Sequence, residues 1–354
     1  MALDQYYLLG RSGLRVSRLA LGTMNFGTGG FHAAYGKTEA DARPIFRKYL
    51  DEGGNFVDTA DFYTAGESET ILGKLIAETN ARDRLVLTTK FTNTVDPADP
   101  NAGGNGRKHM IRALEASLRR LGTDHVDLFL LHTWDRITPV EEVVRTFDDL
   151  VRAGKIRYPG LSDVPSWYAA RAQTLAETQS LAPMVNLQLP YSLVQREIET
   201  EHVPMGQALG LGVTAWSPLA GGFLTGKYRD GGTGRLSEAP TWTERDRQLL
   251  KPLDEVANTL GVAMAQVAIN WVATQPGIAA AIVGASSADQ LGRSMAALDF
   301  ELPPELRAQL DEASAVPPAS VYRMFTPAYQ NWIVSPGLKI GDKPAGYAPA
   351  VRNW

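Results

Sequence analysis

Polar side chains follow the ends of several short apolar segments, and their types suit proton transfer. They are Asp58, Tyr63, Lys90, His132, Ser162, Asp163 and Gln188. If these segments are parallel strands of one barrel, the side chains meet at one rim, because barrel enzymes place reactive groups at the C-terminal ends of their strands. Singly, each residue type also has an ordinary structural role in turns, packing or solvation. Their joint placement at successive segment ends favours chemistry.

Together these residue types suit the protonation of a carbonyl oxygen. A lysine ammonium beside a tyrosine hydroxyl favours the phenolate and lowers a tyrosine pKa that starts at about 10. A carboxylate such as Asp58 keeps the ammonium of Lys90 charged and in place, so we expect Tyr63 to give and take a proton near neutral pH. His132 could orient the carbonyl oxygen. The set supplies no electrons, so a hydride donor such as a nicotinamide has to be added.

Eight short apolar segments alternate with segments of helical periodicity. The expected strands are 19–22, 55–58, 85–89, 126–131, 156–161, 185–189, 212–216 and 280–283, and the clearest helices are 38–50, 109–121, 142–151 and 264–273. Such alternation predicts an α/β fold with a parallel sheet covered by helices. The turn after the first strand leads into a loop and not into a helix, which favours a (β/α)8 TIM barrel over a doubly wound sheet.

The composition excludes several classes of function. The chain has 354 residues, with 35 Lys and Arg against 39 Asp and Glu, so its formal net charge is −4. A nucleic-acid surface would need a clustered basic excess, and we expect none. The chain has no cysteine, which excludes disulfides, cysteine-bound zinc, iron–sulfur clusters and a thiol nucleophile. The five histidines lack metal-binding spacing, so we also expect no metal site.

Length and hydropathy indicate one domain without a membrane span. No segment reaches the run of about 18 apolar residues that a membrane helix needs, so we expect no membrane insertion and a cytoplasmic location. A barrel needs about 250 residues, which leaves roughly 100 to explain. We expect a single domain over 1–354, with the surplus in an N-terminal β-hairpin at 6–21, long rim loops after Phe91 and Gly226, and a C-terminal tail over 316–354.

Two glycine motifs resemble nucleotide-binding loops. Residues 210–215 fit G-x-G-x-x-A, but they precede an expected strand, whereas the dinucleotide motif follows a strand and opens a helix. Residues 221–227 resemble a phosphate-binding loop, although Tyr228 stands where a serine or threonine would bind magnesium. We interpret the second motif as a glycine-rich loop whose lysine can hold a phosphate.

At these residues the sequence resembles the aldo-keto reductase superfamily, over residues from about 7 to about 310. The matching motifs are NFVDTADFY at 55–63, TTK at 88–90, LLH at 130–132, GLSD at 160–163, Gln188, AWSPLAGG at 215–222, GKY at 226–228, VGAS at 283–286 and QL at 290–291. The look is closest to the subgroup that contains the β-subunits of potassium channels and their bacterial reductase relatives. The resemblance implies the barrel fold and the reduction of carbonyl groups.

The resemblance also implies a role for each matched residue. It places Asp58, Tyr63, Lys90 and His132 in a catalytic tetrad with Tyr63 as the general acid. The implied cofactor contacts are Trp216 on the nicotinamide ring, Ser162, Asp163 and Gln188 on its carboxamide, Ser217, Leu219, Gly221 and Lys227 on the pyrophosphate, and Gly284, Ser286 and Gln290 at the adenosine end. We expect Gly22, Thr23, Met24 and Asp58 to contact the cofactor as well.

Some positions depart from the family pattern. Asp163 replaces the more usual asparagine, and Ser286 replaces the arginine or lysine that many relatives use on the 2′-phosphate. Arg235 and Arg293 are candidate substitutes, because a guanidinium matches a phosphate bidentately. We therefore expect NADPH/NADP+ as the cofactor, with NADH as the other option.

Aromatic residues in the expected rim loops are candidates for substrate contact, and ordinary packing is the alternative for each. They are Phe26, Phe62, Phe91 and Trp134, beside Tyr63 and His132 of the tetrad. The tail adds Tyr322, Phe325, Tyr329 and Trp332. A tail folded over the mouth would suit bulky apolar ketones, such as terpenoid or other multi-ring ones, and the alternative is a strap on the barrel wall. The oligomeric state is not readable.

Three functions follow from these observations. The first is an NADPH-dependent reductase of aldehydes or ketones. The second is a cofactor-sensing regulatory subunit that binds a membrane partner, as the subgroup implies. The resembling channel subunits lack a histidine at the position of His132, and this chain keeps it, which favours an enzyme. The third is a metal-free barrel hydrolase or lyase that uses Asp58 as a base and binds no nicotinamide.

Overall fold

Eight parallel strands close into a barrel in the computed structural model, which describes residues 3–228 and 242–334. They are β3 Leu19–Gly22, β4 Phe56–Asp58, β5 Val86–Phe91, β6 Val126–Leu131, β7 Ile156–Ser162, β8 Asn186–Pro190, β9 Gly212–Trp216 and β10 Ile278–Val283. The order around the barrel follows the chain from β3 to β10, and β10 pairs with both β9 and β3. The predicted TIM barrel is confirmed, and its closure leaves no barrel strand with an open edge.

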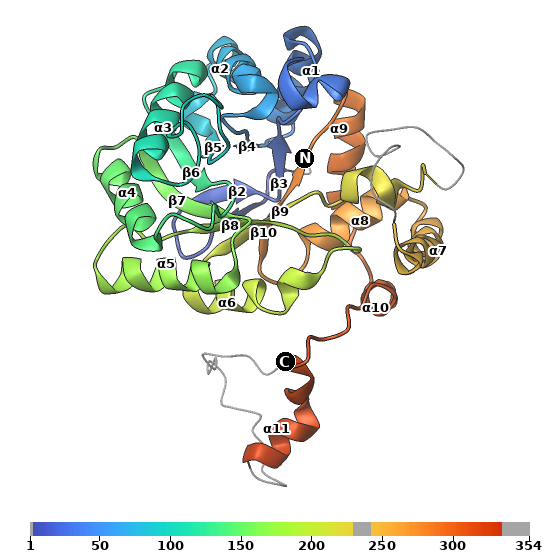
Figure 1. Cartoon of the computed structure of the whole chain (residues 1–354). Coiled ribbons are helices and arrows are strands. Elements are labelled where there is room, and N and C mark those ends of the chain that lie inside the picture. Colours follow the sequence, from blue (N-terminus) through green and yellow to red (C-terminus); the bar gives the residue numbers. More distant parts are fainter. Residues whose placement is uncertain (1–2, 229–241, 335–354) are drawn as a thin grey trace.

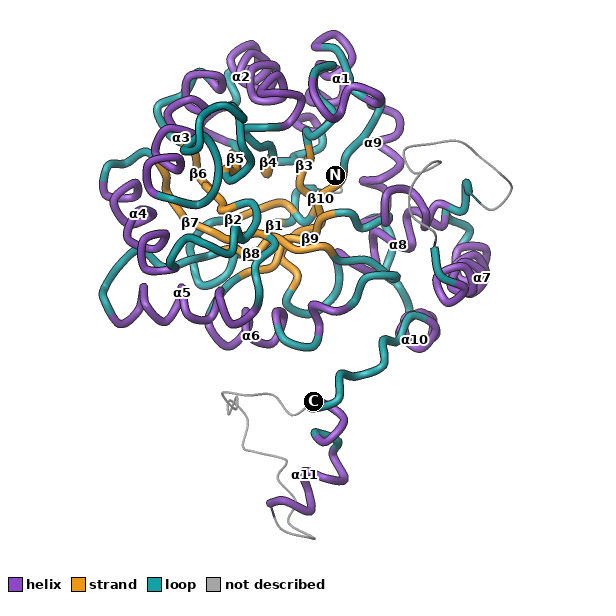
Figure 2. Tube along the Cα trace, in the orientation of Figure 1, coloured by secondary structure: helices purple, strands orange, loops and turns teal. Residues whose placement is uncertain are grey.

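Helices form the outer layer around this barrel (Figures 1 and 2). They are α1 Glu39–Asp51, α2 Glu67–Thr79, α3 Arg107–Leu121, α4 Val140–Arg152, α5 Ser166–Thr178, α6 His202–Leu209, α7 Glu244–Leu260, α8 Met264–Ala273 and α9 Ala288–Met295. The signals that predict α1 and α3 act as expected. Thr38 and Asp41 form a reciprocal capping box at the start of α1, and Gly122 ends α3 at a φ of 66°.

The predicted N-terminal hairpin consists of β1 Tyr6–Leu8 and β2 Arg15–Ser17, paired antiparallel. Leu9 and Val16 pack with residues of the barrel interior, so the hairpin closes the end of the barrel opposite the expected rim. Gly10 lies where a Cβ would come within 2.6 Å of the carbonyl oxygens of Val185 and Gly210, at a φ of 58°. Only glycine fits this close approach.

Side chains of each barrel strand alternate between the interior and the surrounding helices, because successive strand residues point to opposite faces. On β5, Val86 belongs to the interior cluster with Phe56, whereas Phe91 belongs to the outer cluster with the helices. Lys90 has the same parity as Val86, and Asp58 has the same parity as Phe56. Both polar side chains therefore point into the barrel, where they meet.

The prediction that Phe91 lies in a rim loop and contacts substrate is wrong. It is the last residue of β5, it is fully buried, and its ring stacks on Phe129 with centroids 5.0 Å apart. The strand runs two residues beyond the expected end at Thr89, and this parity turns Phe91 toward the helices.

The predicted tail follows α10 Pro304–Ala313, and its described part, 316–334, ends with α11 Pro327–Val334. Arg196 and Arg245 bond the chain just before it, through the carbonyls of Asp311 and Ser314 respectively. Tyr322 donates to Glu201 at the start of α6 at 2.9 Å. Figure 1 shows α11 outside the ring of helices. Up to Val334, the tail is therefore neither a cover over the mouth nor a strap flat on the wall.

Three features of the described segments relate to the sequence interpretations. Gly210 and Gly212 precede β9 and do not open a helix, so the dinucleotide fingerprint is absent there. Within residues 3–228 and 242–334, no single helix is long and apolar enough to cross a membrane, and only α7 with α8, bent by 96°, meets that criterion as a pair. The same residues contain no group of three or more metal-ligating side chains.

Candidate active site

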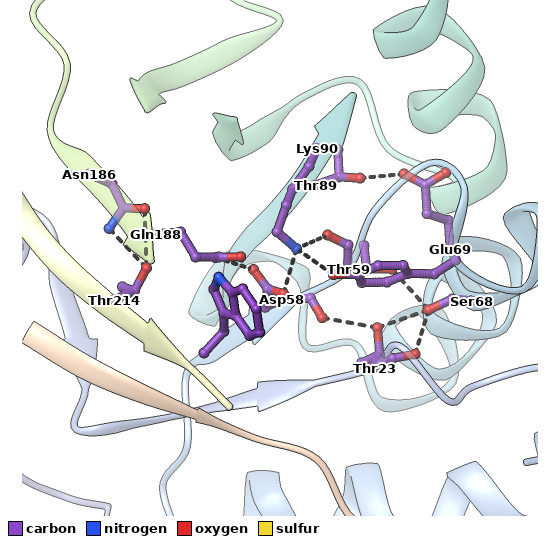
Figure 3. Close-up of polar contacts among 12 residues, drawn as sticks. Thr23, Asp58, Thr59, Ser68, Glu69, Thr89, Lys90, Asn186, Gln188 and Thr214 are labelled. Atoms are coloured by element: carbon purple, nitrogen blue, oxygen red, sulfur yellow. Dashed lines mark hydrogen bonds and ion pairs between the residues drawn. The ribbon is translucent and has the colours of Figure 1, made fainter. Parts of the chain in front are cut away.

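A buried ion pair joins β4 to β5 at the C-terminal end of the barrel (Figure 3). The ammonium of Lys90 lies 2.6 Å from Asp58 Oδ1 and 2.7 Å from the carbonyl oxygen of Thr59. It also donates to the hydroxyl of Tyr63 at 3.3 Å. Lys90 is fully buried, so all three of its protons have partners inside the protein. Three of the four expected catalytic residues are thus in direct contact.

The second oxygen of Asp58 is held from the opposite side of the barrel. The side-chain amide of Gln188, on β8, donates to Asp58 Oδ2 at 2.7 Å. The carboxylate is therefore bound at both oxygens and is nearly buried. The resemblance implies Gln188 as a contact of the cofactor, whereas in the structure its amide nitrogen is bound to Asp58. Such a carboxylate orients Lys90 and is poorly placed to act as a free base.

Tyr63 lies in a short, unusual turn after β4. The residues after it, Thr64, Ala65 and Gly66, have φ values of 48°, 58° and 89°. A β-branched residue at positive φ is strained, and Thr64 is held by its hydroxyl, which donates to the Phe26 carbonyl at 2.6 Å and accepts from the amide of Ser68 at 3.0 Å. This turn fixes the Tyr63 ring beside Lys90.

The protonation states differ from one expectation. Burial raises the pKa of the Tyr63 hydroxyl, Lys90 lowers it by less, and the net shift is upward. The expected net lowering is wrong, because desolvation of the phenolate outweighs a cation already paired with Asp58. Burial lowers the pKa of Lys90, but Asp58 and Tyr63 raise it by more. Tyr63 therefore holds its proton at neutral pH, which suits a proton donor.

His132 follows β6 and packs against the same tyrosine. Its ring centroid lies 5.7 Å from that of Tyr63 and 5.2 Å from that of Phe62. Burial, and then the charge of Lys90, hold its pKa well below the usual value for histidine, so the imidazole is neutral. Its Nδ1 is buried and has no hydrogen-bond partner among the described residues. The predicted tetrad is thus one contiguous cluster.

The ends of β7 and β9 carry groups that suit a nicotinamide and its carboxamide. The Ser162 hydroxyl is buried and unpartnered within the described segments, which leaves it available to an amide. Trp216 Nε1 donates to Asp163 Oδ1 at 3.1 Å, which orients the partly exposed indole. Burial raises the pKa of Asp163 to about 6, against the opposing effects of Trp216 and Lys90.

The segment after β9 suits a phosphate. Ser217, Ala220, Gly221 and Gly222 have φ values of 58°, 48°, 66° and 95°, so the chain turns tightly there. The side chain of Lys227 lies against this turn, since a Cβ added to Gly222 would come within 3.1 Å of Lys227 Cε. Lys227 is exposed and has no ion-pair partner in the described part of the chain. A tight turn beside an available cation can hold an anion, and the partly exposed Leu219 lies in the same turn.

The expected adenosine-end residues lie after β10 and in α9. Gly284 and Ser286 are exposed, and the Ser286 amide donates to Gln290 Oε1 at 2.7 Å, which fixes this loop. Arg293 is exposed in the last turn of α9. Arg235, the other candidate for the 2′-phosphate, lies outside the described residues.

At the end of β3, two predicted contacts are enclosed by protein. Thr23 is fully buried, and its hydroxyl bonds the carbonyl of Asp58 at 3.0 Å and Ser68 at 2.9 Å. Phe26 is fully buried in the outer core. Neither has surface to offer a ligand, so the structure gives both a supporting position. Gly22 is also buried, whereas Met24 is partly exposed.

The remaining aromatic predictions separate into two groups. Phe62 is partly exposed, and its ring lies 5.1 Å from that of Tyr63, so it borders the tetrad. Trp134 packs instead against Trp167 and Tyr168 at the start of α5, with centroids 5.5 Å and 6.2 Å away. It is a rim residue that faces α5.

Two residues next to His132 are absent from the predicted site. Thr92 Oγ1 accepts from the His132 amide at 3.2 Å and donates to Asn105 Oδ1 at 2.6 Å. Asn105 lies in the loop before α3 and follows no strand, so the rule that places reactive groups at strand ends does not find it. Only the folded path of the loop brings it to the site.

Comparison with known proteins gives a consistent result. The model of the Aldo/keto reductase family matches residues 18–315. An uncharacterised oxidoreductase of Bacillus subtilis, YrpG, is 38% identical over 87% of this chain and 95% of its own. A Schizosaccharomyces pombe protein that carries the name "Putative voltage-gated potassium channel subunit beta" is 35% identical, over 87% of this chain and 92% of its own. Norsolorinic acid reductase of Aspergillus flavus is 32% identical, over 85% and 79%.

Proposed function

The chain belongs to the aldo/keto reductase family, and from this premise we propose that it reduces aldehydes or ketones with NADPH, with Tyr63 as the proton donor. Membership makes it an NAD(P)H-dependent oxidoreductase, and its reductase relatives support carbonyl reduction as the reaction class. The observation that carries the assignment of residues is the contact of Lys90 with both Asp58 and Tyr63.

The proposed mechanism divides the work between the cofactor and the tetrad. A bound reduced nicotinamide supplies the hydride for the carbonyl carbon. Tyr63 holds its proton at neutral pH and gives it to the carbonyl oxygen, so that hydride and proton together turn C=O into CH–OH. The phenolate left on Tyr63 faces the ammonium of Lys90, which stabilises it electrostatically. Neutral His132 can hydrogen-bond the carbonyl oxygen without adding charge.

The proposed cofactor contacts form two groups, one at the nicotinamide end and one at the pyrophosphate. Ser162, Asp163 and Trp216 surround the nicotinamide end, and the turn after β9 with Lys227 takes the pyrophosphate. For the choice of NADPH over NADH, exposed Arg293 is the described candidate for the 2′-phosphate. A single well-placed guanidinium is enough for that role.

We propose a bulky ketone, multi-ring or terpenoid-like, as the substrate. Support comes from Phe62, whose partly exposed ring borders Tyr63 and His132. It also comes from relatives named for the reduction of norsolorinic acid and versiconal hemiacetal acetate. The small molecule is the only partner proposed. A single domain and a cytoplasmic location stay predictions, which limited proteolysis and cell fractionation would test.

The channel-subunit relative is the reason to keep a second candidate, a cofactor-sensing regulatory subunit. That function predicts tight NADPH binding with negligible turnover. The hydrolase alternative is less well supported, because Asp58 is bound at both oxygens and cannot readily serve as a base.

The test is a panel of small and multi-ring aldehydes and ketones, assayed with NADPH and NADH in parallel. Tyr63→Phe should lower kcat by about 10²- to 10⁴-fold, the usual contribution of a general acid, while NADPH binding persists. Tyr168→Phe is the matched control, because this buried hydroxyl has no partner in the described residues and lies outside the site. Full turnover by Tyr63→Phe, or no reduction of any panel compound, would contradict the proposal.

A further inference from the structure

One asparagine side chain is linked to the backbone on both sides of His132, once through Thr92 and once directly. Asn105 Oδ1 accepts from the hydroxyl of Thr92, whose oxygen in turn accepts from the His132 amide at 3.2 Å. Asn105 Nδ2 donates to the carbonyl oxygen of Thr133 at 3.0 Å. The His132 amide, which also donates to the Phe91 carbonyl at 2.9 Å, and the Thr133 carbonyl are thus both linked to a residue 27 positions before His132.

This arrangement is buried and under strain. Asn105 is fully buried, and Thr92 is 9% exposed. Thr92 has a φ of 142°, which a β-branched residue rarely adopts. Strained conformations persist only where surrounding contacts hold them, and they gather at functional sites. The contacts that hold Thr92 are its bond to Asn105 and the bond from the Gly104 amide to its carbonyl, at 2.7 Å.

Asn105 itself is fixed from a second loop. The backbone amide of Asn105 donates to Asp135 Oδ2 at 2.8 Å, and the same carboxylate accepts from the backbone amides of Ile137 and Thr138. Asp135 therefore joins the loop before α3 to the loop after β6. Asn105 cannot shift without breaking this link. Its side chain therefore bonds Thr92 and Thr133 from a fixed position.

We propose that Asn105 is a positioning residue that holds the His132 backbone so that the imidazole stays against Tyr63. The inference rests on the proposed function, because it concerns the reductase role of His132. Within the described residues Asn105 makes no hydrogen bond to a tetrad side chain, and it acts through Thr92 and Thr133. Displacements of about 1 Å at a reacting group can cost 10²-fold in rate, so a loosened His132 should lower kcat measurably.

The first experiment is a double-mutant cycle with Asn105→Ala and His132→Ala, assayed on a small aldehyde. If Asn105 acts through His132, Asn105→Ala should lower kcat by about tenfold in the wild-type background and by less than about twofold in the His132→Ala background. The Kd for NADPH should stay within about twofold in all variants. Thr92→Val should behave like Asn105→Ala, whereas Thr92→Ser, which keeps the hydroxyl, should retain most of the activity.

The second experiment reads the histidine directly and does not depend on turnover. The five histidines are labelled with ¹³C at Cε1, and the His132 signal is assigned from His132→Gln. Asn105→Ala should shift or broaden this signal. The matched control is Asn186→Ala, since Asn186 is a fully buried asparagine on β8 that bonds Thr214 on β9 at 3.2 Å (Figure 3).

The outcomes separate the two proposals. An equal loss of kcat from Asn105→Ala in both backgrounds, or an equal effect of Asn186→Ala on the His132 signal, overturns the positioning role. If the wild-type protein reduces no carbonyl compound, the proposed function fails, and the His132 signal still decides whether Asn105 positions the ring. An unchanged signal in Asn105→Ala then removes the inference as well.

Discussion

Gln188 and Asp58 hydrogen-bond across the full width of the barrel, from amide nitrogen to carboxylate oxygen at 2.7 Å. Their strands, β8 and β4, lie four places apart in the ring of eight, which is the largest separation that the ring allows. The bond therefore fixes the distance between opposite walls. Lys90 donates to the other oxygen of Asp58, so this one carboxylate connects Lys90 with Gln188.

Gln188→Leu removes the hydrogen bond to Asp58 without changing the size of the side chain greatly. We expect the free energy of unfolding to fall by about 2–3 kcal/mol, because a buried carboxylate oxygen loses its donor. Urea unfolding measures the change. Gln248→Leu, on the exposed side of α7, should alter stability by less than about 0.5 kcal/mol. Equal stabilities of the two variants would show that Asp58 finds another partner.

Asp61→Asn should stabilise the protein increasingly as the pH rises. Burial, and then the charge of Glu69, raise the pKa of Asp61 to about 8, against the smaller opposing effects of Arg120, the Phe62 backbone amide and Lys90. A carboxyl whose pKa is raised by folding contributes stability below its unfolded value of 3.8, and that contribution is lost as pH rises through 8. Asparagine does not titrate, so it avoids the loss.

The expected difference between Asp61→Asn and the wild type is small at pH 4 and reaches several kcal/mol at pH 8, since each pH unit is worth about 1.4 kcal/mol. Urea unfolding at a series of pH values measures it. Asp83→Asn, at an exposed position, is the control and should stay within about 0.5 kcal/mol of the wild type. A difference that does not grow with pH would argue against a neutral Asp61.

Asp163 should make the choice between oxidised and reduced cofactor depend on pH. Burial raises its pKa to about 6, so the group is neutral below that pH and negative above it. If it lies beside the nicotinamide, as proposed, its charge favours the positively charged oxidised ring. The affinity for NADP+ relative to NADPH should therefore rise on the order of tenfold between pH 5 and pH 7.5.

Fluorescence titrations of both cofactors at each pH measure this ratio without turnover. Asp163→Asn, which carries no charge at any of these pH values, should give a flat ratio. A pH dependence that survives in Asp163→Asn would assign the effect to another group.

Phe62 and Phe91 should respond differently to the same substitution. Phe91→Ala removes a ring from the outer core, so we expect a loss of about 3–5 kcal/mol in unfolding free energy. Phe62→Ala removes a partly exposed ring beside Tyr63 and His132, so we expect a several-fold rise in KM for multi-ring ketones with a smaller loss of stability. Steady-state kinetics and urea unfolding on both variants separate the roles, and a reversed pattern would contradict them.

Much of the fold can be predicted from the sequence because the barrel strands are short apolar runs with clear ends. The same regularity predicts the tetrad, since Asp58 ends β4 and Lys90 is the last residue of β5 but one, both with inward parity. Phe91 shows the limit. Its chemistry suits a substrate contact, and only the exact strand end, two residues beyond Thr89, decides which way it points.

Other features depend on tertiary distances that no spacing rule contains. Asn105 reaches His132 through the path of a long loop. The pKa of Tyr63 is the net result of burial, which raises it, and a paired lysine, which lowers it by less. The sequence contains both groups, but whether the pKa of Tyr63 rises or falls depends on how deeply the hydroxyl is buried.

The barrel closes only when β10 pairs with β3, and the ribosome synthesises these two strands far apart in time. Ala281 pairs with Leu19, and Asn25 donates to a carbonyl 260 residues later in the sequence. A ribosome that adds about 10 residues per second needs roughly half a minute to produce that stretch. During that time β3 has no partner on one side, and an open strand edge is a template for aggregation. Until β10 has been synthesised, the unpaired edge of β3 is therefore a site where another strand can add.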